Sequence, residues 1–155
     1  LRSLAFCEGR QHLDLHTLHH HQAPRTISDM SVKVAVAGRS RSIYTGLIRI
    51  DPSCPGAEAY QENRNLILSP RARAEALPEL EILTDDVLCT HGATLSPVDA
   101  EQLFYLESRG LSRGQALRLV LMGFFDACLT GLPDTLRAAV EEQLGLRLDR
   151  IGGGR

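Results

Sequence analysis

The spacing of the apolar residues changes once along this chain, and that change limits the folds open to it. Up to about residue 92, apolar and polar residues alternate as in β-strands, and from Ser96 onward apolar residues recur at helical spacing. The alternation is clearest in residues 42–50, where both strand faces carry apolar side chains: Tyr44, Ile48 and Ile50 on one, Ile43 and Leu47 on the other. We therefore expect strands that are covered on both sides or stacked in layers.

Further strands are expected at residues 13–16, 65–68, 80–83 and 87–91, with turn sequences at residues 51–56 and 69–70. Two-residue hairpin signals of the Asn-Gly type are missing from this half of the sequence. Their absence favours a solenoid or parallel β-helix over a meander of hairpins. We assign this β-helix portion to residues 1–94.

Residues 95–150 are predicted to form a small α-helical domain of three helices. Ser96 followed by Pro97 is expected to start the first helix, and Ser112 with Gln115 forms a capping box for the second. The second helix carries a wide apolar stripe that ends at Cys128, itself expected in the core, and the stripe either faces a partner or lies wholly inside the protein. The candidate partner-binding residues are Phe104, Leu121, Phe124 and Phe125. Residues 151–155 should form a flexible tail.

Cys89 and His91 are the candidate metal ligands. Two residues apart on one strand, they should point to the same face, with alpha carbons about 6.5–7 Å apart. Thiolate and imidazole suit iron–sulfur clusters, zinc and copper, but two ligands are too few for a closed site. The pair is therefore either half of a site shared with another chain, or a partly buried cysteine beside a hydrogen-bonded histidine.

Other histidines and cysteines give weaker signals. His19 and His21 would share a strand face in a histidine-rich tract. We interpret these histidines as solvated or hydrogen-bonded side chains in preference to a metal site. Cys54 is expected to be an ordinary turn residue. The four cysteines are widely spaced and show no disulfide framework, which indicates a reducing, cytoplasmic setting.

Charge and hydropathy exclude some classes of partner. The formal net charge of -2 provides no basic surface for nucleic acid. No run of about 18 apolar residues is present to span a membrane, and the N-terminal residues lack the apolar core of a signal peptide. The 43% hydrophobic content suffices for one good core, or for a layered body with a small appendage.

Four segments together resemble one known family: GLIRI at 46–50, NRNLIL at 63–68, LEILTDDVLCTHGAT at 80–94 and DAEQLFYLESRG at 99–110. The chain resembles the C-terminal part of SufD-type members of the SufB/SufD family, which belong to the SUF iron–sulfur cluster assembly complex. The resemblance covers residues 12–147. It implies a mainly β fold, a partial right-handed parallel β-helix followed by a small helical C-terminal domain.

The resemblance also implies a function and partners. The chain would be a non-catalytic scaffold subunit that docks the ATPase SufC through its helices and meets SufB at the end of the β-helix. His91, with Cys89 beside it, would contribute to a transient iron–sulfur cluster shared with SufB, and no tightly bound cofactor is expected in the isolated chain. The isolated chain could instead form a homodimer.

Two other classes of function stay open. A purely structural adaptor would dock SufC and use Cys89 and His91 only for packing. An acyltransferase on a hexapeptide-repeat solenoid could use His91 as a base, but its aliphatic-glycine repeat every six residues is not visible in this sequence.

Overall fold

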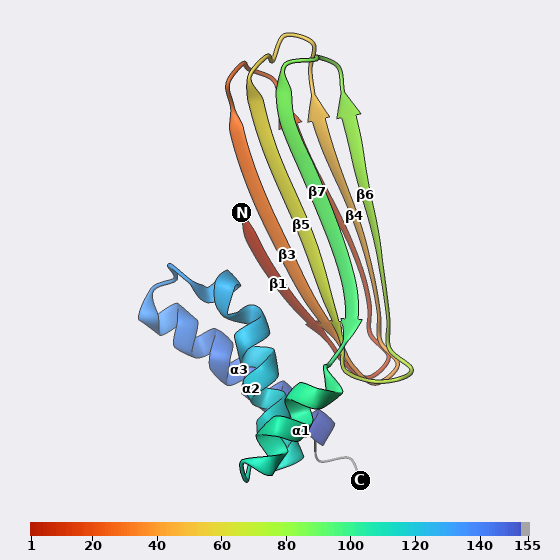
Figure 1. Ribbon diagram of the computed structural model, residues 1–155, viewed down its shortest axis with the longest axis vertical. Coiled ribbons are helices and arrows are strands. Elements are labelled where there is room, and N and C mark those ends of the chain that lie inside the picture. The colour runs from red at the N-terminus through yellow and green to blue at the C-terminus, as the bar shows by residue number, and fades with distance from the viewer. Residues whose placement is uncertain (153–155) are drawn as a thin grey trace.

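The computed structural model describes residues 1–152, which form seven β-strands followed by three helices (Figure 1). The strands are β1 (Arg2–Cys7), β2 (His12–His21), β3 (Ile27–Val36), β4 (Arg41–Ile50), β5 (Ala57–Ile67), β6 (Arg73–Ile82) and β7 (Val87–Pro97). Odd-numbered strands form one sheet in the order β1-β3-β5-β7, and even-numbered strands form another in the order β2-β4-β6. Every pairing is parallel, so the chain winds as a β-solenoid of about three turns, as expected.

Each turn of the solenoid stacks its residues on those of the turn before. Ala59 of β5, for example, pairs with Ser28 of β3 on one side and with Cys89 of β7 on the other. Neighbouring strands in such a ladder lie about 4.8 Å apart, so inward-facing side chains form columns that run along the solenoid axis. The residues that share a column are therefore about thirty positions apart in the sequence.

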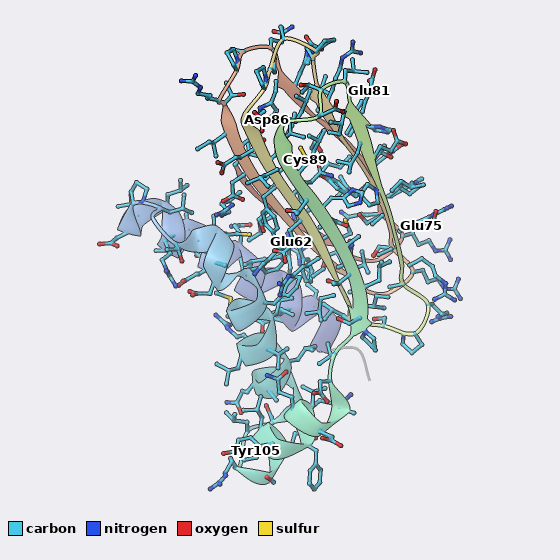
Figure 2. All side chains as sticks on the ribbon, turned by 45° about the horizontal axis from the view of Figure 1, so that its top comes forward. Glu62, Glu75, Glu81, Asp86, Cys89 and Tyr105 are labelled. Atoms are coloured by element: carbon cyan, nitrogen blue, oxygen red, sulfur yellow. The ribbon has the colours of Figure 1, made fainter. Side chains whose placement is uncertain are left out.

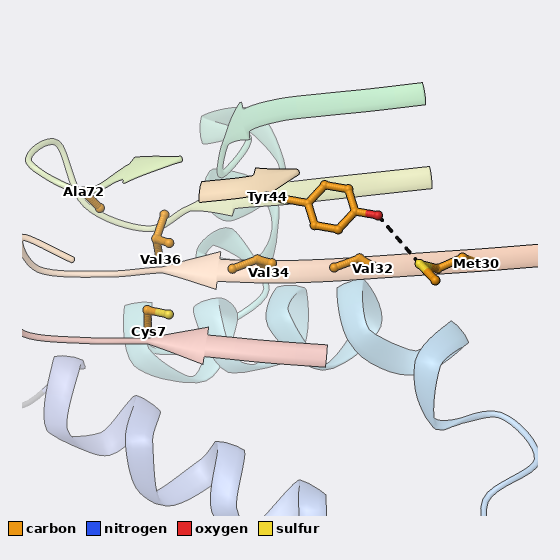
Figure 3. Packing of buried hydrophobic residues seen from close by; sticks show 7 residues of the cluster. All are labelled: Cys7, Met30, Val32, Val34, Val36, Tyr44 and Ala72. Carbon is orange, nitrogen blue, oxygen red and sulfur yellow. Dashed lines mark hydrogen bonds between the residues drawn. The ribbon is translucent and has the colours of Figure 1, made fainter. Parts of the chain in front are cut away.

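The hydrophobic core lies between the two sheets (Figure 3). Tyr44 of β4 is fully buried there, and its hydroxyl hydrogen-bonds Thr17 of β2 at 2.8 Å and approaches the sulfur of Met30 at 3.7 Å. The other buried residues of this cluster are Cys7 of β1, Val32, Val34 and Val36 of β3, and Ala72 just before β6. Tyr44, Ile48 and Ile50 do share the buried face of β4, as their alternation predicts.

The strands differ from the sequence expectation in length and coverage. Most are 10 or 11 residues long, and β1 and β3 were not predicted at all. The expectation that both faces of residues 42–50 are covered is wrong for the described residues, because Ile43 and Leu47 lie on an outer face and remain half-buried. Stacking in layers, the other alternative, is what the structure shows.

Three helices follow the last strand: α1 (Ala100–Ser108), α2 (Arg113–Leu129) and α3 (Asp134–Gly152). The capping box of Ser112 and Gln115 at the start of α2 is confirmed. The predicted cap at Ser96 is wrong, because Ser96 and Pro97 continue β7 beside Leu66 and Ile67. Asp99 caps α1 instead, and its carboxylate accepts hydrogen bonds from the backbone N–H groups of Glu101 and Gln102.

The helices cover part of the outer face of the odd-numbered sheet. Leu121 and Phe125 of α2, with Leu144 and Leu148 of α3, pack against Ala35 and Leu66. Lys33 of β3, the one lysine in the sequence, is buried in this contact. Its ammonium group donates a 2.6 Å hydrogen bond to the carbonyl oxygen of Phe124 and lies 5.3 Å from the centre of that ring.

The boundaries of the parts follow from these elements. Strand β7 runs to Pro97, past the expected end of the β-helix portion at residue 94. Most of the tail expected at residues 151–155 lies outside the described residues, and α3 extends to Gly152. None of the helices within residues 1–152 has both the length and the apolar character that a membrane crossing requires.

Candidate functional site

Cys89 and His91 lie on β7, the last strand of its sheet (Figure 2 labels Cys89). Cys89 packs inward beside Ile48, Ala57 and Ala59, so the face that it shares with His91 is the inner face of the sheet. His91 is nevertheless exposed, because no further strand of the described residues follows β7 in the ladder. The thiol and the imidazole therefore share the inner face of β7, as expected, and they lie at the open end of the solenoid.

The environments of the two candidate ligands differ. Cys89 is half-buried, and burial raises the pKa of its thiol, although a hydrogen bond with the backbone of Ala59 acts in the opposite direction. A raised pKa favours the neutral thiol, whereas a metal ligand must be the thiolate. His91 is exposed and needs no such ionisation, since a neutral imidazole binds metal directly. His91 is therefore the better donor of the two.

Sequence reasoning missed a row of buried amide side chains on β5, the strand that pairs with β7. Gln61, Asn63 and Asn65 of β5 all point into the solenoid and are about 1% exposed. Gln61 donates to the carbonyl of Gly46 at 3.1 Å, and Asn65 donates to the side-chain oxygen of Asn63 at 2.6 Å. The sequence signal was present, because Gln61, Asn63 and Asn65 alternate with Glu62 and Arg64, but polar residues at every position conceal which face is buried.

No closed metal site is built by the described residues. Within residues 1–152, no group of three or more His, Cys, Asp or Glu side chains is placed to hold a metal ion. Cys89 and His91 are two donors of suitable chemistry at an open end, so a bound metal or cluster would need ligands from elsewhere. All four cysteines are free thiols.

The predicted common face of His19 and His21 is confirmed, and both rings are buried inside the solenoid. Thr26 donates to the carbonyl of Ala23, so it accepts from Nδ1–H of His21 at 2.6 Å. Nε2 of the neutral His21 ring then accepts from the hydroxyl of Ser28 at 2.8 Å, and Nδ1 of His19 donates to the same hydroxyl at 3.0 Å. These histidines are satisfied by hydroxyl groups. Cys54, expected to be an ordinary turn residue, is fully buried, and its thiol donates to the carbonyl of His21.

This histidine pair predicts a stability that falls as the pH is lowered through the ordinary histidine pKa of 6.5. Burial lowers the pKa of His19, and His21 lowers it further, while Asp29 opposes the shift; burial and His20 lower the pKa of His21. The folded protein therefore binds fewer protons than the unfolded chain below pH 6.5, so the stabilisation is complete above that pH and is lost below it.

The measurement is the free energy of unfolding by urea between pH 5 and 8. We expect His21→Asn to flatten the pH dependence, and His12→Asn, which removes an exposed imidazole from the same strand, to leave it unchanged. An unaltered slope in His21→Asn would show that the buried pair does not cause the pH dependence.

The candidate partner-binding residues occupy different environments. Leu121 and Phe125 are fully buried against the sheet, and Phe124 is half-buried over Lys33. Phe104 on α1 is 71% exposed, with Tyr105 beside it and Leu119 of α2 also exposed (Tyr105 is labelled in Figure 2). Of the four residues, only Phe104 is freely accessible in this structure.

A groove of about 600 Å³ lies where β5 and β7 end against α1 and α2. Ile67, Pro97, Leu103 and Leu117 are among its lining residues. Pro97 lies six positions after His91 on β7, a distance of about 20 Å along a strand. The groove is therefore not part of the Cys89 and His91 site.

Fold and site together define a parallel β-solenoid with an appended helical domain and an exposed histidine on its last strand. Residues 1–124 match the family described as "SUF system FeS cluster assembly, SufBD core domain". The chain belongs to this SufBD family of the SUF iron–sulfur cluster assembly system.

Curated relatives agree with this assignment. The iron–sulfur cluster assembly protein SufD of Escherichia coli is 32% identical over all of this chain, which covers 36% of that protein. A SufBD family protein of Mycobacterium leprae is 33% identical over 97% of this chain, and the match covers 42% of that protein. A SufBD family protein of Synechocystis is 34% identical over 84% of this chain, and the match covers 29% of that protein. The chain thus spans less than half the length of these relatives.

Proposed function

We propose that this chain is a non-catalytic part of a SUF scaffold, and that it contributes His91 to a nascent iron–sulfur cluster at a junction with SufB. The observation that carries the proposal is the exposed imidazole on the inner face of the terminal strand β7. A donor at the open end of a solenoid can meet donors from a second chain, and iron and sulfide are then the cargo of the assembled complex.

The partner at this end would be SufB. Strand β7 has a neighbour on one side only, so its other edge presents unpaired backbone N–H and C=O groups within the described chain. A second solenoid could pair with that edge and bring its own ligands close to His91. Cys89 would play a smaller part, because its half-buried thiol is held largely in the neutral form.

The partner at the helical domain would be the ATPase SufC, and turnover would reside there. Phe104 and Tyr105 of α1 and Leu119 of α2 are exposed, and these accessible apolar side chains support this docking role. Buried Leu121 and Phe125, with half-buried Phe124, would hold α2 in place against the sheet. Movement of α1 and α2 during ATP hydrolysis would reach the strands through Pro97, where β7 leads into α1.

The test is reconstitution of the complete complex with SufB and SufC, followed by anaerobic loading with iron and sulfide. We expect His91→Ala to reduce the visible absorbance of the cluster by about tenfold or more, since loss of a group that only orients a metal ligand already costs 10–100-fold in metal affinity and His91 would be a ligand itself. His16→Ala removes an exposed histidine of β2 and should leave the absorbance unchanged. A normal cluster yield with His91→Ala would contradict the proposed role.

A purely structural adaptor is the second candidate function. It is favoured by the packing of Cys89 against the apolar cluster of Ile48, Ile50 and Cys54, which is a structural task. In that case Phe104→Asp would abolish co-purification with SufC, while His91→Ala would leave cluster assembly intact. If Phe104→Asp leaves SufC binding unchanged, the exposed surface of α1 is not the docking site.

A further inference from the structure

Gln61 and His91 occupy the same column inside the solenoid. The pairing of β5 with β7 places their alpha carbons side by side, and Met30 of β3 is the next member of the column. Both side chains lie on the inner face of the sheet, about 4.8 Å apart at the backbone. His91 is therefore the residue stacked directly on Gln61 at the open end.

The carboxamide of Gln61 is held in one orientation. Its nitrogen donates to the carbonyl oxygen of Gly46 on the opposite sheet, so a flipped amide would bring two oxygens together. Its oxygen, Oε1, is buried and has no hydrogen-bond partner in the described part of the chain. A buried acceptor left without a hydrogen bond is destabilising, so a donor for this oxygen is strongly favourable.

The other donors in this part of the core are already engaged. The amide of Asn63 donates to the carbonyl of Val32, and that of Asn65 donates to Asn63 and to the carbonyl of Thr94. The Tyr44 hydroxyl is shared between Thr17 and Met30. An N–H of His91, on the adjacent strand of the same column, is a further side-chain donor that can reach Gln61.

We propose that Gln61 is a positioning residue for His91: its Oε1 accepts a hydrogen bond from one imidazole N–H when the ring turns over the column. A neutral imidazole has one N–H and one nitrogen with a free lone pair, so this hydrogen bond selects the tautomer. It directs the lone pair of the other nitrogen away from Gln61, toward the open end. The value of this arrangement for metal binding rests on the proposed function, whereas the hydrogen bond itself does not.

The test is the tautomer of His91 in the complete protein, labelled with ¹⁵N at histidine and kept at a pH where the ring is neutral. Long-range ¹H–¹⁵N correlation spectra distinguish the two tautomers, and His91→Gln assigns the signal. A hydrogen bond worth one to two kcal/mol changes a population ratio by about 5–30-fold. We expect the ratio of the two tautomers of His91 to exceed that of the exposed His12 by at least about fivefold. Gln61→Met should remove this preference.

Asn65→Leu is the matched control. It also replaces a buried amide of β5 whose oxygen is unpartnered, but the residue stacked on Asn65 is Leu95. It should leave the tautomer ratio of His91 unchanged. A ratio that changes less than twofold in Gln61→Met would overturn the proposal. If Gln61→Met does not fold, the wild-type protein still tests the proposal. A tautomer ratio of His91 equal to that of His12 would then overturn it.

The same spectra separate this proposal from the proposed function, because they need neither iron nor sulfide. A tautomer preference that depends on Gln61, combined with normal cluster assembly in His91→Ala, would support the positioning and reject the role of His91 in assembly. Lost assembly in His91→Ala without a tautomer preference would do the reverse.

Discussion

Replacing Gly46 by alanine is expected to destabilise the protein by about 2–4 kcal/mol, because the added methyl group has no room. The new Cβ would lie 2.5 Å from the hydroxyl of Tyr44 and 2.7 Å from Cδ of Gln61, and still closer to the amide nitrogen of Gln61. Both side chains are buried and hydrogen-bonded, so moving them breaks the Gln61 contact with Gly46 and disturbs the Tyr44 contact with Thr17. The measurement is the free energy of unfolding in urea.

Gly92→Ala is the matched control for this prediction. Gly92 lies in β7, has no positive φ, and a Cβ added there meets nothing within 4 Å. We expect its stability to remain within about 0.5 kcal/mol of the wild type. Adding Gln61→Ala to Gly46→Ala should restore only part of the loss, since Tyr44 still crowds the new methyl group. Equal stabilities of the two single glycine variants would contradict the close packing at Gly46.

Phe125→Ala is expected to cost about 3–5 kcal/mol, the usual loss for a fully buried phenylalanine. The ring is 0% exposed and joins α2 to Ala35 and Leu66 of the sheet and to Leu144 and Leu148 of α3. Its loss removes much of the contact that holds the helices to the solenoid. Hydrogen exchange measured by mass spectrometry should therefore show α2 and α3 opening before β3 and β5.

Phe104→Ala provides the comparison with an exposed phenylalanine. Its ring on α1 is 71% exposed, so its removal should change the stability by less than about 0.5 kcal/mol. This difference also matters for testing the proposed docking of SufC, because a binding defect in Phe104→Ala could not be attributed to unfolding, whereas a defect in Phe125→Ala could. If both variants lose similar stability, the assignment of Phe104 to the surface is wrong.

The contrast between these two phenylalanines marks a limit of sequence reasoning. The helical spacing correctly grouped Leu121, Phe125 and Cys128 on one stripe of α2, and all three are buried. It could not decide whether the stripe faces this chain or another, because a period reports which side chains share a face but not what covers that face. In the structure, Leu121 and Phe125 pack against Ala35 and Leu66 on the outer face of the sheet. For these two residues, the stripe therefore faces this chain.

Strand β3 shows why one of the most buried strands was missed. Residues Met30–Val36 are all buried, and most are apolar without alternation. Their inner face lies in the core between the sheets, and part of their outer face lies under the helices, so both faces favour apolar side chains. Lys33 interrupts the run and suggests solvent, but its ammonium group is satisfied by the carbonyl of Phe124, 91 residues away.

The sequence by itself determined the local features of this protein: strands in its first part, helices in its last part, the capping box at Ser112, and the common face of Cys89 and His91. These depend on neighbours within a few positions, where the periods of strand and helix operate. Only the tertiary structure decided that His91 stacks on Gln61, that Gln61 reaches Gly46, and that His19 and His21 share Ser28. Stacking successive turns of the solenoid joins residues about thirty positions apart, and a local pattern carries no information on that register.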